Sequence, residues 1–433
     1  MAAAALALAP QAGLIALMLA GCGLCVAISI QQLAVSAIGL RHGIAPAEPG
    51  ALLPDAELPV YTILVPLYRE AAVVPGLITA LERLDYPSER LDVKLLVEAD
   101  DPETPRALAE LPLGPQYEVV EVPPGFPQTK PKACNYGLAR ARGELVVIFD
   151  AEDRPAPDQL RKAASAFRTA DPDVACFQAR LGFWNPATNL LTRYCTAEYC
   201  AIFEITRPGL EWVGAPIPLG GTSNHFPTAL LRALGGWDAF NVTEDADLGI
   251  RLARLGYRTR SLDSLTLEEA NSRAGNWIRQ QSRWIKGYMQ TWLVHVRRPR
   301  QLRAQIGGGS AVHFTLTMLT PVLPVLLAPF GWIVTLLWFV SLTGVAIPLL
   351  PGWLLLVSAV AWLVGNGAGI AIWTAALRRC NLREIVPYTV LFHLHQLLKF
   401  VAAAKAIAQL VTRPSYWEKT DHGLDPGVAS ATG

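Results

Sequence analysis

An apolar run that stops at a group of acids, within residues 144–153, most constrains how this 433-residue chain can fold. Residues 145–149 have the composition of a strand buried on both faces, as in the centre of a parallel sheet. Asp150, Glu152 and Asp153 follow at once. Ligands of open α/β sheets bind at the carboxyl ends of the strands, and carboxylate oxygens suit Mg²⁺ or Mn²⁺. Taken alone, the cluster also fits an acidic loop or a helix cap.

The composition indicates membrane segments. Apolar residues make up 52% of the chain and charged residues only 17%, whereas soluble proteins carry about 25% charged residues. The net charge of +1 argues against a nucleic-acid binder, which would need a basic face. Seven scattered cysteines, an odd number, predict neither a zinc site nor a disulfide framework.

The first membrane segment is predicted at residues 1–40, which are nearly all apolar or small. This length is enough to span a bilayer. No Lys or Arg occurs before Arg41, so the charged start of a signal peptide is lacking. We therefore expect an uncleaved anchor with its C-terminal flank in the cytoplasm. Residues 41–59 contain four prolines and are predicted to form a linker.

A second membrane region is predicted at residues 309–411. Residues 311–347 are too long for one straight span, so we expect a helical hairpin, with one kinked span as the alternative. Residues 353–377 form another expected span. Residues 385–411 contain two histidines and two lysines and fit either a span facing other helices or an amphipathic helix in the interface.

The positive charges give conflicting indications of topology. Positive residues concentrate on the cytoplasmic side of membrane proteins. The four arginines between residues 297 and 303 therefore place the start of the second membrane region in the cytoplasm. A hairpin followed by two spans would leave Arg378, Arg379 and Arg383 outside, against the rule. A kinked span followed by a straight one would keep them inside, but the lengths favour the hairpin.

Between the membrane regions, the sequence of residues 60–275 has the pattern of an α/β domain. Strands and helices alternate, which indicates a mostly parallel sheet with helices on both faces. The strands are expected at residues 60–65, 93–98, 118–122, 145–149 and 174–179, and the helices at 70–84, 106–110, 132–142 and 157–169. An amphipathic interface region (276–308) follows this domain, and a cytoplasmic tail (412–433) ends the sequence.

Two further groups of polar residues follow expected strands. Glu98, Asp100 and Asp101 come at the end of the strand at 93–98, where they can accept hydrogen bonds from a nucleobase or ribose; turn capping is the alternative. Lys130 and Lys132 stand at a helix start, where a cation and free backbone N–H groups suit a phosphate. An exposed basic loop is the alternative there.

Two helices carry further candidates. Thr243, Glu244 and Asp245 head a helix with apolar periodicity. A carboxylate at this position suits a general base for an attacking hydroxyl, although Thr243 also fits a simple cap. Gln280, Arg283 and Trp284 lie on the helical run 276–296. An indole stacks well on the apolar face of a sugar, and an interfacial helix is compatible with this role.

In this order the motifs resemble the membrane-integrated family-2 glycosyltransferases, a group of the GT-A fold that includes cellulose, mannan and hyaluronan synthases. The resemblance covers roughly residues 60–290. It rests on the early Asp motif at 98–101, K-A-x-N at 132–135, the D-x-D position at 150–152, T-E-D at 243–245 and Q-x-x-R-W at 280–284. It implies an α/β fold, with a GT-A nucleotide-sugar-binding domain flanked by N- and C-terminal transmembrane α-helices.

The resemblance also implies roles for single residues. Asp100 or Asp101, with Glu98, would contact the nucleoside, and Lys132 would face the diphosphate. The pair Glu244 and Asp245 would supply the base, which the family pattern places at Asp245. The metal, Mg²⁺ or Mn²⁺, would be held by Asp150 with Glu152 or Asp153. The acceptor would be bound by Gln280, Arg283 and Trp284 and by a loop that carries Thr222, Asn224 and His225; a plain turn is the alternative for that loop.

The implied activity is inverting transfer of a sugar from a UDP- or GDP-sugar to a hydroxyl of a growing β-linked polysaccharide at the membrane. A lipid acceptor (ceramide, diacylglycerol or polyprenyl phosphate) is the alternative, and a non-catalytic scaffold is a third. We expect a multi-pass protein of the inner (plasma) membrane with a cytoplasmic catalytic domain, no nucleic-acid partner, and room for an export partner or a homo-oligomer. The charged and aromatic tail at 413–420 suits a return to the active site.

Overall fold

The computed structural model describes residues 10–44, 52–345, 350–421 and 423. Parts of four predicted segments lie outside the described residues. They are residues 1–9 of the anchor, 45–51 of the linker, 346–349 of the C-terminal membrane region, and 422 and 424–433 of the tail.

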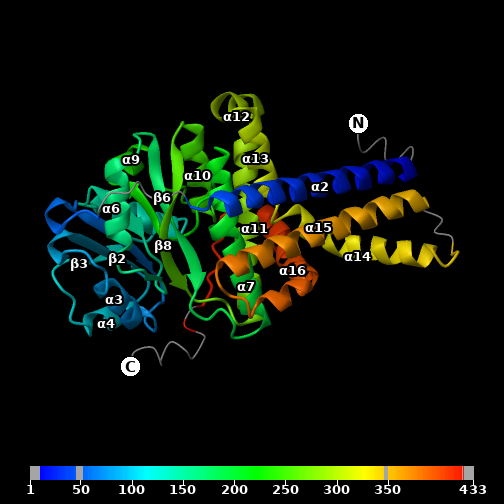
Figure 1. The fold of residues 1–433 in the computed structure, drawn as a ribbon. Helices are drawn as coiled ribbons and strands as arrows, with labels where there is room; N and C mark the ends of the chain where they lie inside the picture. Colours follow the sequence, from blue (N-terminus) through cyan, green and yellow to red (C-terminus); the bar gives the residue numbers. More distant parts are fainter. Residues whose placement is uncertain (1–9, 45–51, 346–349, 422, 424–433) are drawn as a thin grey trace.

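An α/β domain lies at one end of the molecule, and long helices extend from it at the other (Figure 1). In the described residues the domain has one eight-stranded sheet, in the order β3-β2-β1-β4-β7-β6-β8-β5. The strands are β1 Tyr61–Leu67, β2 Leu91–Glu98, β3 Tyr117–Val122, β4 Leu145–Ile148, β5 Arg154–Pro155, β6 Val174–Phe183, β7 Asn224–Pro227 and β8 Arg258–Glu268.

The sheet is mixed. Strands β3, β2, β1 and β4 are parallel neighbours, as the alternating pattern predicts, and β6 and β8 are also parallel. Strand β7 runs antiparallel between β4 and β6, and β5 is antiparallel to β8. Strands β5, β7 and β8 were not anticipated from the sequence, because two are short and β8 is rich in polar residues.

Helices cover both faces of the sheet, which is why its strands are apolar on both sides. In β1, Ile63 and Val65 pack towards α3 and α6, whereas Leu64 packs towards α5 and α10. Helix α3 begins only after a turn at residues 70–73, and α5 begins two residues before the expected start. The helices of the domain are α3 Val74–Glu82, α4 Glu103–Ala109, α5 Lys130–Arg140, α6 Gln159–Thr169, α9 Thr228–Ala233 and α10 Glu244–Arg254.

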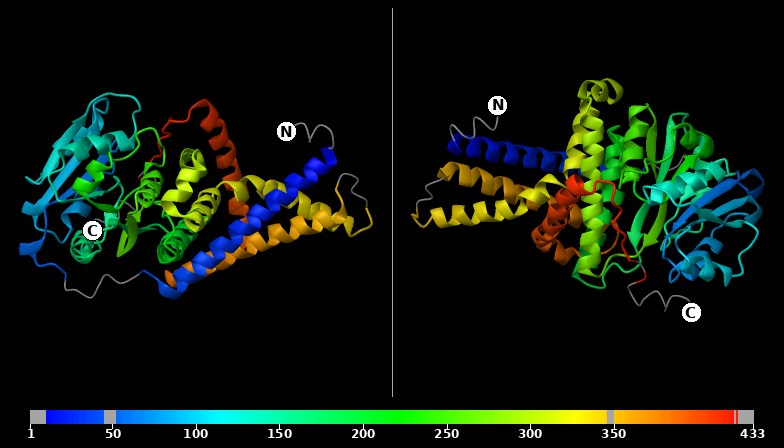
Figure 2. Two further views of the ribbon diagram at one scale, coloured as in Figure 1. Left: turned by 90° about the horizontal axis from the view of Figure 1, so that it is seen from above. Right: turned by 180° about the vertical axis from the view of Figure 1, so that it is seen from behind.

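Three long apolar helices lie side by side beyond the domain (Figures 1 and 2). They are α2 Pro10–His42, α14 Leu323–Ser341 and α15 Gly352–Arg379, and both α2 and α14 pack along α15. Each is long enough to span the hydrocarbon core of a bilayer. Four helical segments of the described chain meet the length and composition of a membrane span, the fourth being Val386–Thr412.

This fourth segment comprises the short turn η4 Val386–Leu391 and α16 Phe392–Thr412, and α16 runs across the other three helices rather than beside them (Figure 2). It packs on α11 (Ala274–Val296) and on α14. Its buried Lys399 pairs with Glu198 of α7 (Leu190–Cys200). The crossing direction fits the amphipathic interface helix, one of the two alternatives that the sequence leaves open.

A collar of further helices joins the sheet to the membrane helices. Its members are α7 Leu190–Cys200, the π-helical turn η3 Ala201–Thr206, α8 Arg207–Trp212, α11 Ala274–Val296, α12 Pro299–Ile306 and α13 Gly308–Leu319. The α7–α8 segment packs on α2 and was not anticipated from the sequence. Helix α2 meets it through Gly39 and Gly209, where a side chain on either glycine would overlap a backbone carbonyl of the other helix.

The helical hairpin expected at residues 311–347 is wrong. Helix α13 packs on α11 and α2, whereas α14 packs on α15 and α16, and the chain bends between them next to Pro321. The polar residues of α13 explain this position, because Gln31 of α2 donates a hydrogen bond to Thr317 (3.3 Å). Helix α15 therefore returns to the domain, and Arg379 lies against Gly43 at the end of α2. The arrangement is that of the single kinked span.

This path predicts which residues share a side of the membrane. Single cysteines at Glu89 of the domain and Glu384 after α15 should react with a membrane-impermeant maleimide from the same side, and a cysteine at Thr343 from the other. All three sites are exposed. The background should lack the partly exposed thiols of Cys22, Cys25 and Cys380. Labelling of Thr343 from the same side as Glu89, and of Glu384 from the other side, would instead support the helical hairpin.

Candidate active site

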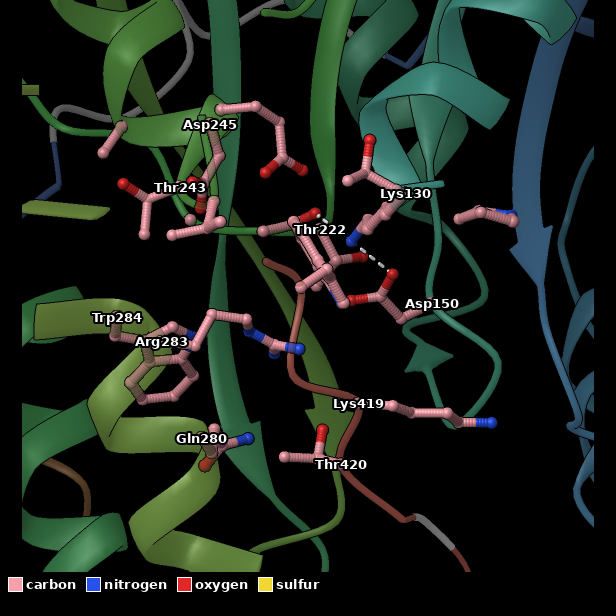
Figure 3. A pocket seen from close by; sticks show the side chains of 18 of the residues that line it. Lys130, Asp150, Thr222, Thr243, Asp245, Gln280, Arg283, Trp284, Lys419 and Thr420 are labelled. Atoms are coloured by element: carbon pink, nitrogen blue, oxygen red, sulfur yellow. Dashed lines mark hydrogen bonds and ion pairs between the residues drawn. The ribbon is translucent and has the colours of Figure 1, made fainter. Parts of the chain in front are cut away.

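The main polar cavity, of about 570 Å³, lies where β1, β2 and β4 end and α5, α10 and α11 meet (Figure 3). Its wall includes a segment that follows α16, residues 415–420. The side chains that the argument uses, all in its lining, are Tyr68, Glu98, Gln128, Lys130, Asp150, Glu152, Arg207, Gly221, Thr222, Glu244, Asp245, Glu268, Gln280, Arg283, Trp284 and Lys419.

Three charged groups surround one point at the centre of the cavity. Lys130, at the start of α5, pairs with Asp150 after β4 and donates a second hydrogen bond to the carbonyl of Gly221 (2.7 Å). A methyl group on Gly221 would stand 3.7 Å from both Lys130 Nζ and Asp245 Oδ2, and 4.0 Å from Asp150 Oδ2. A cation and two carboxylates from distant parts of the sequence therefore converge on a space the size of one small group.

The acids after β4 divide into two kinds. Asp150 and Glu152 line the cavity. Asp153 is 1% exposed, accepts a hydrogen bond from the amide of Asp150 (2.7 Å) and bonds to the hydroxyl of Thr222. Burial raises the pKa of Asp153 well above its usual range. Asp153 therefore braces the loop, and Glu152 is the better second partner for a metal ion.

The charge around Asp150 and Glu152 fits a divalent cation. Glu268, at the end of β8, also lines the cavity, and burial followed by the charges of Glu152 and Asp150 raises its pKa to about 8. In the described part of the chain, no three His, Cys, Asp or Glu side chains are grouped as metal ligands. Asp150 and Glu152 would thus supply two oxygens, and the remaining ligands would come from the bound substrate or water.

Two adjacent acids open helix α10. Burial, then the charge of Asp245, raises the pKa of Glu244 to about 8. Burial also raises the pKa of Asp245, but the amide of Ala246 and the charge of Lys130 offset part of that effect. Two neighbouring buried carboxyls do not both ionise readily. Asp245 is therefore the better candidate for a base, because the environment of Glu244 favours its protonated form more strongly.

Asp100 is exposed beside the far end of the cavity, where two lining residues, Tyr68 and Gln128, contact it. Its carboxylate accepts hydrogen bonds from Gln128 Nε2 (2.6 Å) and the hydroxyl of Tyr68 (3.2 Å). Glu98 lines the cavity beside it and pairs with Lys132 (2.9 Å). When a nucleoside binds, these groups can give up the hydrogen bonds between them and form hydrogen bonds to the nucleoside instead.

Two residues expected at this end have other roles. Asp101 is 2% exposed and accepts hydrogen bonds from the amides of Arg69 and Thr104 and from the Thr104 hydroxyl. Asp101 therefore caps a turn, which is the alternative role that the sequence allowed. Lys132 is directed to Glu98 and does not line the cavity, whereas Lys130 does. A helix turns by about 100° per residue, so two lysines that are two residues apart lie on different faces of α5.

Only one residue of the expected acceptor loop faces the cavity. Thr222 lines it, but Asn224 and His225 belong to β7 and are buried inside the sheet. Asn224 donates to the carbonyl of Gly220 (2.5 Å). His225 is 0% exposed, its Nδ1 bonds to the Tyr61 hydroxyl (2.7 Å), and burial lowers its pKa to about 3. We correct the prediction for these two residues, since an unanticipated strand contains them.

Gln280, Arg283 and Trp284 of α11 all line the cavity and lie together along that helix (Figure 3). Gln280 is oriented by Asn271, which donates to its Oε1 (3.0 Å). The Arg283 guanidinium lies over the ring of Trp417, 4.6 Å from its centroid. The helical spacing therefore places the three side chains on one surface, as expected for an acceptor and phosphate site.

The segment after α16 closes the cavity on one side, as the sequence suggested for residues 413–420. Lys419 bonds to the carbonyls of Tyr68 and Arg69 and pairs with Glu70 (3.3 Å). The preceding Glu418 pairs with Lys405 of α16 (2.6 Å). The segment is thus fixed on one side next to the sheet and on the other to α16.

Sequence reasoning did not assign four residues of the cavity. Lys130 was within a recognised motif, but the neighbouring lysine was preferred. Gly221 carries no functional side chain and gives no signal. Glu268 ends a strand that was not anticipated, and Arg207 lies in the unpredicted α7–α8 segment. Glu268 is an acid at the end of β8, which pairs in parallel with β6. An acid at the end of a strand was the signal that could have identified it.

Comparison with known proteins identifies relatives of this site and fold. A model of glycosyl transferase family group 2 matches residues 145–374, and one of glycosyl transferase family 2 matches residues 62–213. Beta-monoglucosyldiacylglycerol synthase of Synechocystis sp. is 30% identical over 273 residues, 61% of this chain and 56% of that protein. Glucomannan 4-beta-mannosyltransferase 2 of Arabidopsis thaliana is 29% identical over 259 residues, 57% and 48% respectively.

The chain therefore spans about half the length of the curated relatives it matches. Among solved structures, a mannosyltransferase from Pyrobaculum calidifontis in complex with GDP-Man and Mn²⁺ has a TM-score of 0.53 at 20% identity, covering 89% of this chain and 99% of that one. This likeness shows the fold. It confirms the predicted α/β domain of the GT-A fold.

The raised pKa of Glu244 predicts that the protein loses stability as pH rises. Between pH about 4.5 and about 8 the folded state retains a proton that the unfolded state has lost, so the free energy of unfolding falls with pH. The unfolding temperature of the detergent-purified protein should be lower at pH 9 than at pH 6, and Glu244→Gln should reduce the difference. Exposed Glu121→Gln is the control. An unchanged difference in Glu244→Gln would show that Glu244 ionises normally.

Proposed function

The chain belongs to glycosyl transferase family group 2, and on that premise we propose that it transfers a sugar, with inversion, from a UDP- or GDP-sugar to a hydroxyl group at the membrane. The observation that carries this proposal is the convergence of Asp245, Lys130 and Asp150 on one point of the cavity. A single displacement needs a base for the acceptor proton and positive charge for the leaving diphosphate, both at the reacting carbon.

The donor side of the cavity suits a nucleoside diphosphate. Asp100 and Glu98 would bind the nucleoside, and Lys130 with Arg283 would bind the phosphates, since both cations line the same cavity. Asp150 and Glu152 would hold Mg²⁺ or Mn²⁺. When bound, this ion would supply charge stabilisation to the diphosphate as it leaves. The related archaeal mannosyltransferase is in complex with GDP-Man and Mn²⁺, which supports a metal-dependent donor site.

The acceptor side supplies the base. Asp245 Oδ2 would accept the proton of the attacking hydroxyl, while Glu244 stays neutral and adds no second charge beside it. One base and one displacement invert the anomeric centre without a covalent intermediate. Gln280 would hydrogen-bond the acceptor, and the indole of Trp284 would stack on a sugar ring.

Two acceptor classes suit this chemistry. The Q-x-x-R-W motif and the likeness to glucomannan mannosyltransferases support a growing β-linked polysaccharide, and an export partner or a homo-oligomer would then complete its path. The likeness to a glucosyldiacylglycerol synthase supports a lipid. The arginines in the last turns of α2 and α15 lie at the domain end, which supports a cytoplasmic catalytic domain at the inner (plasma) membrane.

Removal of the base or of a metal ligand should abolish transfer. Detergent-purified protein with a panel of UDP- and GDP-sugars and Mn²⁺ or Mg²⁺ should release the nucleoside diphosphate. Asp245→Asn and Asp150→Asn should each reduce the rate by about a hundredfold or more. Exposed Glu121→Gln should retain the wild-type rate. Full activity of Asp245→Asn would refute the assignment of the base.

A methyl group added at Gly221 should disturb the point on which Asp245, Lys130 and Asp150 converge. Gly221→Ala would place its methyl at ordinary contact distance from the three charged groups, so the fold should survive while the substrate is displaced. We expect kcat/KM to fall roughly ten- to a hundredfold, with the unfolding temperature unchanged. Gly76→Ala, an exposed helical glycine with open space around it, is the control. Normal kinetics in Gly221→Ala would mean that the reaction takes place elsewhere.

A further inference from the structure

A second cavity, of about 740 Å³, lies among the membrane helices directly behind the candidate active site. Helices α2, α14, α15 and α16 all contribute to it, and its lining is mainly aliphatic and aromatic. Representative lining residues are Leu17, Cys25, Phe330, Val334, Trp362 and Ile372. Helices α2 and α14 both pack on α15, and all three of these helices contribute lining residues.

The two cavities have a common wall. Five residues line both of them, and all five come from the α7–α8 segment or from α11. They are Tyr199, Ile202, Arg207, Trp284 and Tyr288. A long molecule whose apolar part occupies the membrane cavity would therefore present its other end to the catalytic cavity.

Arg207 in this wall has no ion-pair partner among the described residues, although the charge of Asp245 in the same cavity acts on it from a distance. It is 5% exposed, its Nη1 has no hydrogen-bond partner, and no described carboxylate forms an ion pair with it. Its guanidinium lies over the ring of Phe203, 4.2 Å from the centroid. The other two charged residues that line the membrane cavity, Glu198 and Lys399, pair with each other.

A buried arginine without a partner needs an anion. Burying an unpaired charge is costly, and a guanidinium binds phosphate particularly well because its donors match the phosphate oxygens. The apolar lining, in contrast, offers few partners for the many hydroxyls of a polysaccharide, and each buried unpaired hydroxyl would cost free energy. The cavity and Arg207 together favour an amphiphile with a negatively charged head.

We propose that the acceptor is a lipid whose hydrocarbon chain occupies the membrane cavity, whose anionic headgroup contacts Arg207 and whose hydroxyl reaches Asp245. The proposal rests on the proposed function. The headgroup oxygen forms the new bond to the anomeric carbon, the bond from that carbon to the donor phosphate breaks, the nucleoside diphosphate leaves with the electron pair, and the hydroxyl proton passes to Asp245. The lipid enters sideways from the bilayer between α2 and α14.

Binding is tested first, without the reaction. Native mass spectrometry of the full chain in detergent would measure the binding of phosphatidylglycerol, which has an anionic phosphate and free hydroxyls, and of diacylglycerol, which is neutral. The wild-type protein should prefer phosphatidylglycerol at least tenfold. Arg207→Met should remove that preference, because the methionine preserves apolar volume and lacks the charge. Equal binding of the two lipids by the wild-type protein would overturn the role of Arg207.

A matched pair of glycines tests the cavity. Gly21 of α2 lines it and has room for a side chain, whereas Gly23 lies outside the lining with nothing near it. Gly21→Leu should weaken phosphatidylglycerol binding and sugar transfer to the lipid at least tenfold, and Gly23→Leu should leave both at the wild-type level. Equal behaviour of the two variants would show that the cavity does not hold the acceptor.

Donor titration separates the two proposals. Loss of lipid transfer in Gly21→Leu, with the affinity for the UDP- or GDP-sugar unchanged, would support the lipid acceptor. A wild-type protein that binds no nucleotide sugar would refute the proposed function itself. A protein that binds the donor and extends a polysaccharide equally well in Gly21→Leu and wild type would refute only the lipid proposal.

Discussion

The catalytic cavity contains more carboxylates than its cations can neutralise, and much of the local structure follows from this excess. Lys130 pairs with Asp150, and burial followed by the charges of Glu152 and Asp150 raises the pKa of Glu268 to about 8. A bound divalent ion would relieve the repulsion. The same site would therefore bind metal and donor together, because each supplies charge that the other needs.

The position of this charged cavity depends on close contact between α2 and α8. Gly39 and Gly209 bring the two backbones together, so a membrane helix is fixed against the segment that carries Arg207. The joint between α7 and α8 is a π-helical turn, and such turns are frequent at functional sites. The active site and the membrane cavity thus have one common wall instead of two separate ones.

The sequence predicted the parts of the fold that depend on local pattern. The parallel strands and the acids at their ends are encoded by apolar periodicity, and Asp150 and Asp245 lie in the cavity as expected. The failures have tertiary causes. Asp101 and His225 have the residue types of a site, but contacts from distant segments bury them. The position of α13 beside α2 is supported by a hydrogen bond from Gln31 to Thr317, which no local pattern shows.

The wall formed by residues 415–420 also has a consequence for biosynthesis. These residues follow the last described helix, yet Lys419 bonds to the backbone next to β1, near the beginning of the domain. The ribosome makes the sheet long before it makes this segment. A nascent chain whose helices are still being inserted therefore has an open, incomplete cavity. If turnover needs the complete wall, it would begin only after the membrane helices have been made and inserted. Hydrolysis of donor sugars by the unfinished chain would then be limited.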